Sequence, residues 1–172
     1  MLKQVALFGA IRRRDHTDEL RWHLIGHLQR NKVKRAVELF TVIHSVDSPR
    51  LIDALAATER PLEVFLQINV TGEAAKYGAA PEQARELLHR ASRSPSLRVT
   101  GLMAMAPFGG DPRPGFRALR ELRDDLRQAG DGPSLAHLSM GMSDDYVVAV
   151  EEGATHVRIG TALVGGKAAG DR

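Results

Sequence analysis

The sequence predicts an α/β fold, and within that class a TIM-type (β/α) barrel. Short apolar runs alternate with amphipathic stretches along the 172 residues, which is typical of βα units built around a mainly parallel sheet. Polar or small residues end several of these runs in succession, and in a barrel such strand ends converge on one mouth. An open doubly wound sheet also fits the alternation, but the glycine-rich dinucleotide loop that would favour it is absent from the sequence. We therefore expect the barrel.

The predicted strands are rich in Val, Ile, Leu or Met, and each run ends in Gly, Ser, Asn, His or Pro. They are Val5–Gly9, Trp22–His27, Thr41–Val46, Val64–Val70, Val99–Met105, Ala136–Gly141 and His156–Val164. This count of about seven strands is one short of a closed TIM barrel, so we expect the barrel to be incomplete.

Amphipathic stretches between these runs are predicted to be helices. In the stretches that begin at Pro49 and Pro81, the proline suits the first helical position because no backbone hydrogen bond is lost there. In a third, Gly130 is the expected C-cap. The predicted helices are Pro49–Thr58, Pro81–Ala91, Pro112–Ala129 and Asp144–Glu152.

The connections between these elements are short, so residues 1–172 are predicted to form a single domain. Pro107 to Pro114 is the loosest segment and is expected to be a surface loop. The small and polar residues 166–172 are expected to form a disordered tail.

Composition argues against several classes of protein. The 24 basic and 21 acidic side chains nearly balance, which disfavours a dedicated nucleic-acid binder. No apolar run approaches the roughly 18–20 residues of a membrane span. The sequence has no cysteine, so disulfides and thiolate metal sites are excluded. We expect a cytoplasmic protein that is a monomer or a weak dimer, with neither a membrane nor a nucleic acid as partner.

The sequence SMGMSDD suggests an anion site where the penultimate strand ends. Ser139 and Gly141 lie there, and Gly160 and Thr161 interrupt the last predicted strand. In barrels a phosphate often lies between the loops after the final two strands, where glycine exposes backbone N–H groups and hydroxyls add donors. These residues also fit a purely structural interpretation, in which Ser143 caps a helix and Gly160 provides a bend.

Arg158 strengthens the anion-site hypothesis because it lies in the apolar run HVRIGTALV, where a charged side chain needs a partner. A phosphate, a carboxylate or a ring acceptor of a ligand could each supply one, and so could a buried Asp or Glu. His27 and Asn69 end other predicted strands and are expected to line the same mouth. Zinc binding by His23 and His27 is disfavoured, because their run reads as a strand entering a turn.

Several segments carry a resemblance to a known family, and they occur in that family's order from about Trp22 to Gly165. These segments are WHLIGHLQRNK, HSVDS, LQINVTGEAAKYG, GLMAMAP, LSMGMSDDY and EEGATHVRIGTALVG. They resemble the pyridoxal phosphate homeostasis proteins, which are similar to the N-terminal barrel of bacterial alanine racemase.

The resemblance implies a single-domain barrel that holds pyridoxal 5′-phosphate (PLP). It implies a carrier or buffer of PLP inside the cell, without an established catalytic reaction and with PLP-dependent apoenzymes as recipients. It also implies a PLP site at the last two strand ends. The residues expected to bind PLP are Ser139, Met140, Gly141, Arg158, Gly160, Thr161, His27 and Asn69.

The N-terminus departs from the family pattern. Family members carry a PLP-binding lysine at the end of their first strand, and their second strand ends in FGEN, whereas Phe8-Gly9 is followed here by Ala10-Ile11. We therefore expect the first helix, the first strand and the lysine to be missing. None of the lysines matches the Schiff-base position; they are Lys3, Lys32, Lys34, Lys76 and Lys167. A start assigned too late and a truncated copy of the gene both explain this departure.

Two alternatives to a PLP carrier remain open. A racemase-like PLP-dependent enzyme is disfavoured, because it needs the missing lysine and a positioned acid–base group. A binder of another phosphorylated metabolite would use the same anion site without covalent chemistry. In either binding hypothesis the phosphate contacts are non-covalent and charge-assisted, so PLP is expected to bind weakly.

Overall fold

The computed structural model describes residues 21–72, 77–107, 109–130 and 135–160. Within them, six strands form one parallel sheet in which the spatial order β1-β2-β3-β4-β5-β6 follows the chain. The strands are β1 (His23–Leu24), β2 (Val42–Val46), β3 (Leu62–Gln67), β4 (Leu97–Met103), β5 (His137–Met142) and β6 (His156–Arg158).

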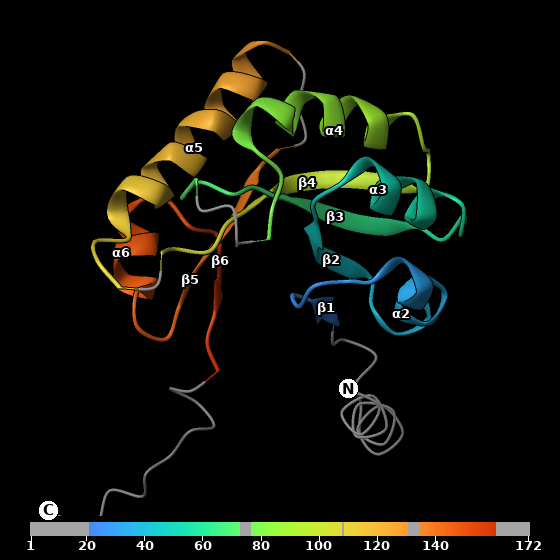
Figure 1. Cartoon of the computed structure of the whole chain (residues 1–172), viewed down its shortest axis with the longest axis horizontal. Coiled ribbons are helices and arrows are strands. Elements are labelled where there is room, and N and C mark those ends of the chain that lie inside the picture. The colour runs from blue at the N-terminus through green and yellow to red at the C-terminus, as the bar shows by residue number, and fades with distance from the viewer. Residues whose placement is uncertain (1–20, 73–76, 108, 131–134, 161–172) are drawn as a thin grey trace, which may run out of the picture.

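Helices connect successive strands, so each strand and the helix after it make one βα unit. The helices are α2 (Val33–Leu39), α3 (Pro49–Ala56), α4 (Ala84–Ser92), α5 (Arg113–Gln128) and α6 (Tyr146–Glu151), with 3-10 turns at Arg30–Lys32 and Pro81–Gln83. Figure 1 shows these helices on the outer side of a curled sheet, with β1 and β6 at its two edges.

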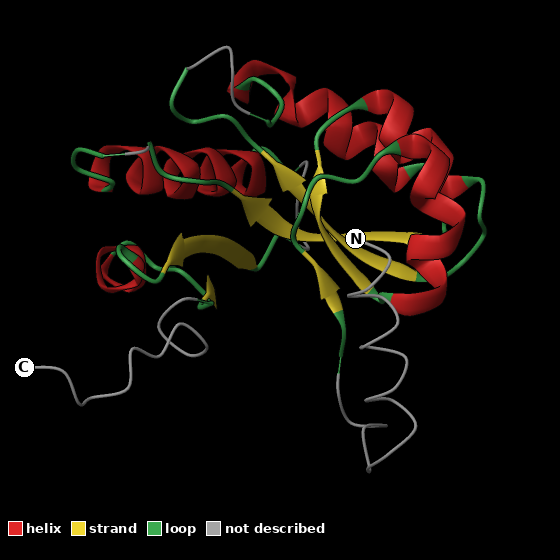
Figure 2. Ribbon diagram, turned by 60° about the horizontal axis from the view of Figure 1, so that its bottom comes forward, coloured by secondary structure: helices red, strands yellow, loops and turns green. Residues whose placement is uncertain are grey.

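In the described part of the chain the curled sheet is an incomplete (β/α) barrel, which confirms the predicted fold class. Figure 2 shows the strands turning progressively around the concave side while the helices stay outside. The register shifts between β2 and β3, between β3 and β4, and between β5 and β6. Such irregularities increase local twist, so they favour curling over a flat sheet.

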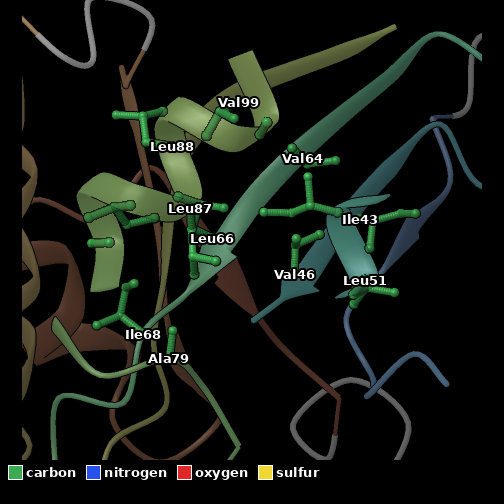
Figure 3. Packing of buried hydrophobic residues seen from close by; sticks show 14 of the residues in the cluster. Ile43, Val46, Leu51, Val64, Leu66, Ile68, Ala79, Leu87, Leu88 and Val99 are labelled. Atoms are coloured by element: carbon green, nitrogen blue, oxygen red, sulfur yellow. The ribbon is translucent and has the colours of Figure 1, made fainter. Parts of the chain in front are cut away.

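The main hydrophobic core lies between the helices and the convex face of the sheet. Ile43 of β2 and Val64 and Leu66 of β3 pack there with Leu87 and Leu88 of α4 (Figure 3). A second, smaller cluster of Val42, Phe65 and Met103 contains no helix residue. Because successive strand residues point to opposite faces, this second cluster belongs to the concave face.

The strands fall within or near the predicted runs but are mostly shorter. The predicted strand Trp22–His27 contains only β1, and the predicted strand His156–Val164 contains only the three residues of β6 among its described part. Each of the predicted helices is present, α5 begins at Arg113 inside the predicted loop, and Gly130 follows α5 with a φ of 79° as expected of a C-cap. The predicted strand Val5–Gly9 and the predicted tail 166–172 lie outside the described residues.

Helix α2 was not predicted from the sequence. Its buried residues Val33, Ala36 and Val37 have the helical spacing of three and four. Lys34 and Arg35 lie between them, so the sequence of this segment resembles an exposed basic loop. Tertiary packing of this narrow apolar stripe, rather than overall apolarity, stabilises the helix.

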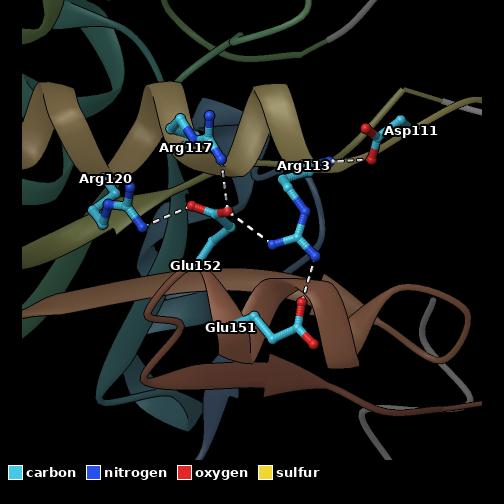
Figure 4. A network of polar contacts seen from close by, with 6 residues as sticks. All are labelled: Asp111, Arg113, Arg117, Arg120, Glu151 and Glu152. Carbon is cyan, nitrogen blue, oxygen red and sulfur yellow. Dashed lines mark hydrogen bonds and ion pairs between the residues drawn. The ribbon is translucent and has the colours of Figure 1, made fainter.

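A network of ion pairs joins α5 to α6 (Figure 4). The carboxylate of Glu152, which is only 3% exposed, accepts from Arg113 at 3.0 Å, from Arg120 at 2.7 Å and from Arg117 at 3.5 Å. Arg113 also pairs with Glu151. Hydrogen bonding by Arg113 and the charges of Arg120 and Arg117 hold the pKa of Glu152 below its usual value. The network fixes α6, and with it the turn that follows β5.

None of the helices in the described part of the chain has the length and apolar character needed to cross a membrane.

Candidate functional site

Arg158 of β6 is a largely buried cation whose protein partners are neutral. Its Nη1 donates to Ser139 Oγ at 3.1 Å and its Nη2 donates to the Ala104 carbonyl at 3.0 Å. Among the described residues no carboxylate forms an ion pair with it, so the buried ion pair considered from the sequence is not formed there. Burial lowers the pKa of Arg158 and the nearby charge of Asp145 opposes that shift, but a guanidinium stays charged in proteins. Within the described residues this positive charge therefore has no ion-pair partner, and Asp145 acts on it only from a distance.

Ser139 lies between this guanidinium and a row of histidines. It is fully buried on β5, and its Oγ is 2.9 Å from His44 Nδ1. On the other side of the His44 ring, Nε2 is 2.8 Å from His23 Nδ1. The hydroxyl of Ser139 thus belongs to the wall of the half-barrel, and only its backbone is left to contact a ligand.

Two more histidines complete an aromatic cluster on the concave face. The ring of His156 lies 5.1 Å from that of His137 and 5.8 Å from that of His44, as centroid distances. Phe65 stacks on His44 at 4.1 Å with an interplanar angle of 10°. The cluster brings together side chains from β1, β2, β3, β5 and β6.

Three histidines of this cluster, His23, His44 and His156, have a pKa below the usual value of a histidine. Burial, followed by the charges of His23, His156 and Arg158, lowers the pKa of His44 to about 3. Burial is also the largest cause of the lowered pKa of His23 and of His156. No set of three His, Asp or Glu side chains in the described ranges is arranged to hold a metal ion.

The sequence argument missed this cluster, although a signal for it exists. His137 precedes Ser139 by two residues, and His156 precedes Arg158 by two. In a strand this spacing places both members of a pair on the same face. The alternation identifies the face, but it does not show that the histidines of β1 and β2 would reach the same place.

The predicted anion-site residues are close together in the chain but have different surroundings. The side chain of Met140 is fully buried in the main core, which leaves its backbone for any ligand contact. Gly141 has a φ of 92°, and a Cβ there would lie 2.6 Å from the Cβ of Ala149. This glycine therefore allows α6 to pack closely against the end of β5, whatever it also does for an anion.

At the end of β6, Gly160 is exposed and nothing would crowd a Cβ there. Thr161 lies outside the described residues. The expected N-cap Ser143 is not the cap of α6. That position is occupied by Asp145, whose Oδ1 accepts from the Met142 amide at 2.5 Å.

His27 and Asn69 lie on other loops of the strand ends. His27 is exposed and stacks on Tyr77, with ring centroids 4.4 Å apart. The Oδ1 of Asn69 accepts from the backbone N and the hydroxyl of Thr71, so this side chain shapes the turn after β3. These contacts lie among the loops at the strand ends, whereas Arg158 contacts Ser139 on the neighbouring strand.

The described lysines do not lie on any strand. Lys32 ends the 3-10 turn before α2 and Lys34 is an exposed residue of α2. The other lysines, Lys3, Lys76 and Lys167, lie outside the described residues.

Comparison with known proteins gives consistent matches. The model of the alanine racemase N-terminal domain matches residues 6–168. The pyridoxal phosphate homeostasis protein of Aquifex aeolicus is 46% identical over 154 residues, which cover 86% of this chain and 67% of that protein. The protein of the same name from Bos taurus is 41% identical over 162 residues, covering 86% of this chain and 59% of the relative. The chain thus spans about three fifths to two thirds of these relatives' lengths.

A solved structure matches the fold as well. The structure of PipY from Synechococcus elongatus with PLP bound superimposes with a TM-score of 0.78 at 35% identity, covering 92% of this chain and 76% of that one.

Proposed function

Since the chain belongs to the alanine racemase N-terminal domain family, together with the pyridoxal phosphate homeostasis proteins, we propose that it binds PLP non-covalently and serves as a carrier or buffer of PLP. The proposed site comprises the ends of β5 and β6. The single observation that carries the proposal is the half-buried guanidinium of Arg158, whose hydrogen-bond partners among the described residues are all neutral. A dianionic phosphate or a ring acceptor of PLP would supply the missing counter-charge or hydrogen-bond partner.

The residues present fit such a ligand. The exposed backbone at Gly160 would present an N–H group to the phosphate, and Thr161 would add a hydroxyl donor. Arg158 would supply the positive charge. PipY, the solved relative, is known with PLP bound, and this supports the same ligand here.

A non-catalytic role is the conclusion favoured by the site. When bound, PLP supplies electron-withdrawing chemistry, but catalysis also needs an acid–base group that titrates near neutral pH. His23, His44 and His156 have lowered pKa values, and His44 is hydrogen-bonded to His23 and to Ser139. In line with the relatives' name of homeostasis protein, we also propose PLP-dependent apoenzymes as recipients. We further propose a monomer or weak dimer as the working state and the cytoplasm as the location.

Calorimetric titration with PLP, pyridoxal, inorganic phosphate and a sugar phosphate would test the proposal. PLP should bind more tightly than each of the others. Arg158→Gln should weaken PLP binding by about tenfold to a hundredfold, because hydrogen bonds to charged groups contribute about 1.5–3 kcal/mol. The matched control Arg127→Gln changes an exposed arginine of α5 and should leave binding unchanged.

Equal binding of PLP and the sugar phosphate would favour the alternative, a general binder of phosphorylated metabolites. Unchanged PLP binding by Arg158→Gln would overturn the site.

A further inference from the structure

Four side chains from four strands form one continuous row of hydrogen bonds on the concave face. The row runs from Arg158 on β6 to Ser139 on β5, then to His44 on β2 and His23 on β1. Its three links measure 3.1, 2.9 and 2.8 Å. Which atom donates in the two links that involve histidine follows from the chemistry of Arg158, at the β6 end of the row.

Arg158 determines the role of the serine oxygen. A guanidinium has N–H donors and no acceptor, so Ser139 Oγ accepts from Nη1. The serine also has one hydrogen of its own to donate. Within the described ranges the side chain has only one other hydrogen-bond partner, Nδ1 of His44.

Two arrangements of the serine–histidine link are conceivable, and their energies differ. If Ser139 donates to His44 Nδ1, each of the three links has one hydrogen and one acceptor, and the serine hydrogen is satisfied. If Nδ1 carried the hydrogen instead, the serine would accept twice and its own hydrogen would be buried without a partner. An unsatisfied buried donor costs about 1–3 kcal/mol, so the first arrangement is preferred.

The histidine tautomers follow from that preference. A neutral His44 that accepts at Nδ1 carries its hydrogen on Nε2, which then donates to Nδ1 of His23. Phe65 and His156 also face His44, at centroid distances of 4.1 and 5.8 Å, but among the described residues neither forms a hydrogen bond with its ring. His23 therefore carries its hydrogen on Nε2.

We propose that His44 is a positioning residue for the ligand-binding guanidinium, acting through a hydrogen-bond row with the single direction Arg158 to Ser139 to His44 to His23. By accepting the serine hydrogen, His44 turns a serine lone pair toward Nη1 of Arg158. Together with the Ala104 carbonyl on Nη2, this fixes the plane of the guanidinium and leaves its other N–H groups for a ligand. The consequence for binding rests on the proposed function, whereas the direction of the row does not.

The ring-nitrogen NMR signals of the ¹⁵N-labelled full chain at neutral pH test the direction. His44 should show the tautomer with hydrogen on Nε2 and a bare Nδ1. A hydrogen on Nδ1 of His44 would overturn the proposal, whether or not PLP binds.

Two substitutions test the positioning role. The amide oxygen of His44→Asn can accept from Ser139 where Nδ1 does now, so PLP binding should stay within about twofold of the unchanged chain. His44→Phe retains an aromatic ring beside Phe65 but has no acceptor, and should weaken PLP binding about threefold to tenfold, as expected for one neutral hydrogen bond. His89→Phe, on the exposed side of α4, is the control and should have no effect.

The outcomes separate this inference from the function on which it builds. Unchanged binding by His44→Phe, or equal loss by His44→Asn and His44→Phe, would refute the positioning role while leaving PLP binding intact. If the unchanged chain binds no PLP, the proposed function fails and the NMR tautomer still decides the direction of the row. The NMR spectrum of the unchanged chain also decides the direction of the row if the His44→Phe variant does not fold.

Discussion

The rings of His23 and His156 lie 6.0 Å apart, although β1 and β6 are the two outermost strands of the sheet. Four strands, β2 to β5, lie between them in the sheet, and five successive strand pairings connect β1 to β6. Side chains from opposite edges meet only because the sheet curls around its concave face. The histidine cluster is therefore a direct product of the half-barrel.

Because of the histidine cluster, the free energy of unfolding should decrease as the pH is lowered, and this decrease should begin at pH values above those at which carboxylates titrate. The pKa of His44 is lowered from 6.5 to about 3, so between these values the unfolded chain binds a proton that the folded chain does not. The free energy of unfolding is then highest above pH 6.5 and falls as pH decreases toward 3. His23 and His156 are shifted in the same direction. Urea unfolding at pH 7.5 and pH 5 should show a loss of about 2 kcal/mol from His44, since one proton contributes about 1.4 kcal/mol per pH unit.

His44→Asn should reduce that difference, because asparagine does not titrate. The control His89→Asn should keep it. A free energy of unfolding that does not change between pH 7.5 and pH 5 would contradict the burial of a neutral His44.

Gly141→Ala should destabilise the fold by about 2–4 kcal/mol. Alanine at a φ of 92° costs about 1–2 kcal/mol, and its Cβ would overlap the Cβ of Ala149 at 2.6 Å. Gly26→Ala is the matched control, because that glycine has no positive φ and nothing lies within 4 Å of a Cβ built there. Chemical unfolding measures both, and equal losses would show that α6 does not pack closely on β5.

The two neighbouring glutamates of the α5–α6 network should differ in importance. Glu152→Ala removes a buried carboxylate shared by three arginines and leaves these cations facing one another, whereas Glu151→Ala removes one exposed partner of Arg113. Thermal unfolding should therefore show a clearly larger fall in Tm for Glu152→Ala. If Glu151→Ala costs as much, the network does not depend on the buried carboxylate.

Reduction with borohydride in the presence of PLP should not trap the ligand on a lysine of the site. The described lysines, Lys32 and Lys34, lie off the sheet, and no lysine of the chain matches the family position. Mass spectrometry of the reduced, digested protein should show at most scattered, substoichiometric labelling. One fully labelled lysine would instead establish a covalent anchor and contradict the non-covalent proposal.

Much of the architecture was predictable because local pattern and fold agree. The runs Thr41–Val46, Val99–Met105 and Ala136–Gly141 each hold most of an observed strand, and prolines at the starts of Pro49–Thr58 and Pro81–Ala91 mark helical segments. Helix α2 escaped prediction because charged residues interrupt its buried stripe. Some predicted strands were too long because their apolar runs continue beyond the last residue that pairs with a neighbouring strand. An apolar residue indicates burial, and burial does not require strand pairing.

The candidate site was only partly predictable for a related reason. Arg158 and Ser139 were identified because a charge in an apolar strand and a polar strand end are local features. His44, His137 and His156 were not assigned to the site, since their partners lie on strands far apart in the sequence.

The sequence by itself determined that a cation would be held inside an apolar strand, because residue type and alternation suffice for that. Only the tertiary structure decided what the cation contacts. Arg158 reaches Ser139 and the Ala104 carbonyl across 19 and 54 residues of chain, and these separations are closed by strand register and sheet curl. Register and curl arise from the packing of all the βα units together, so no single segment contains the information that places a serine, and not a carboxylate, beside this arginine.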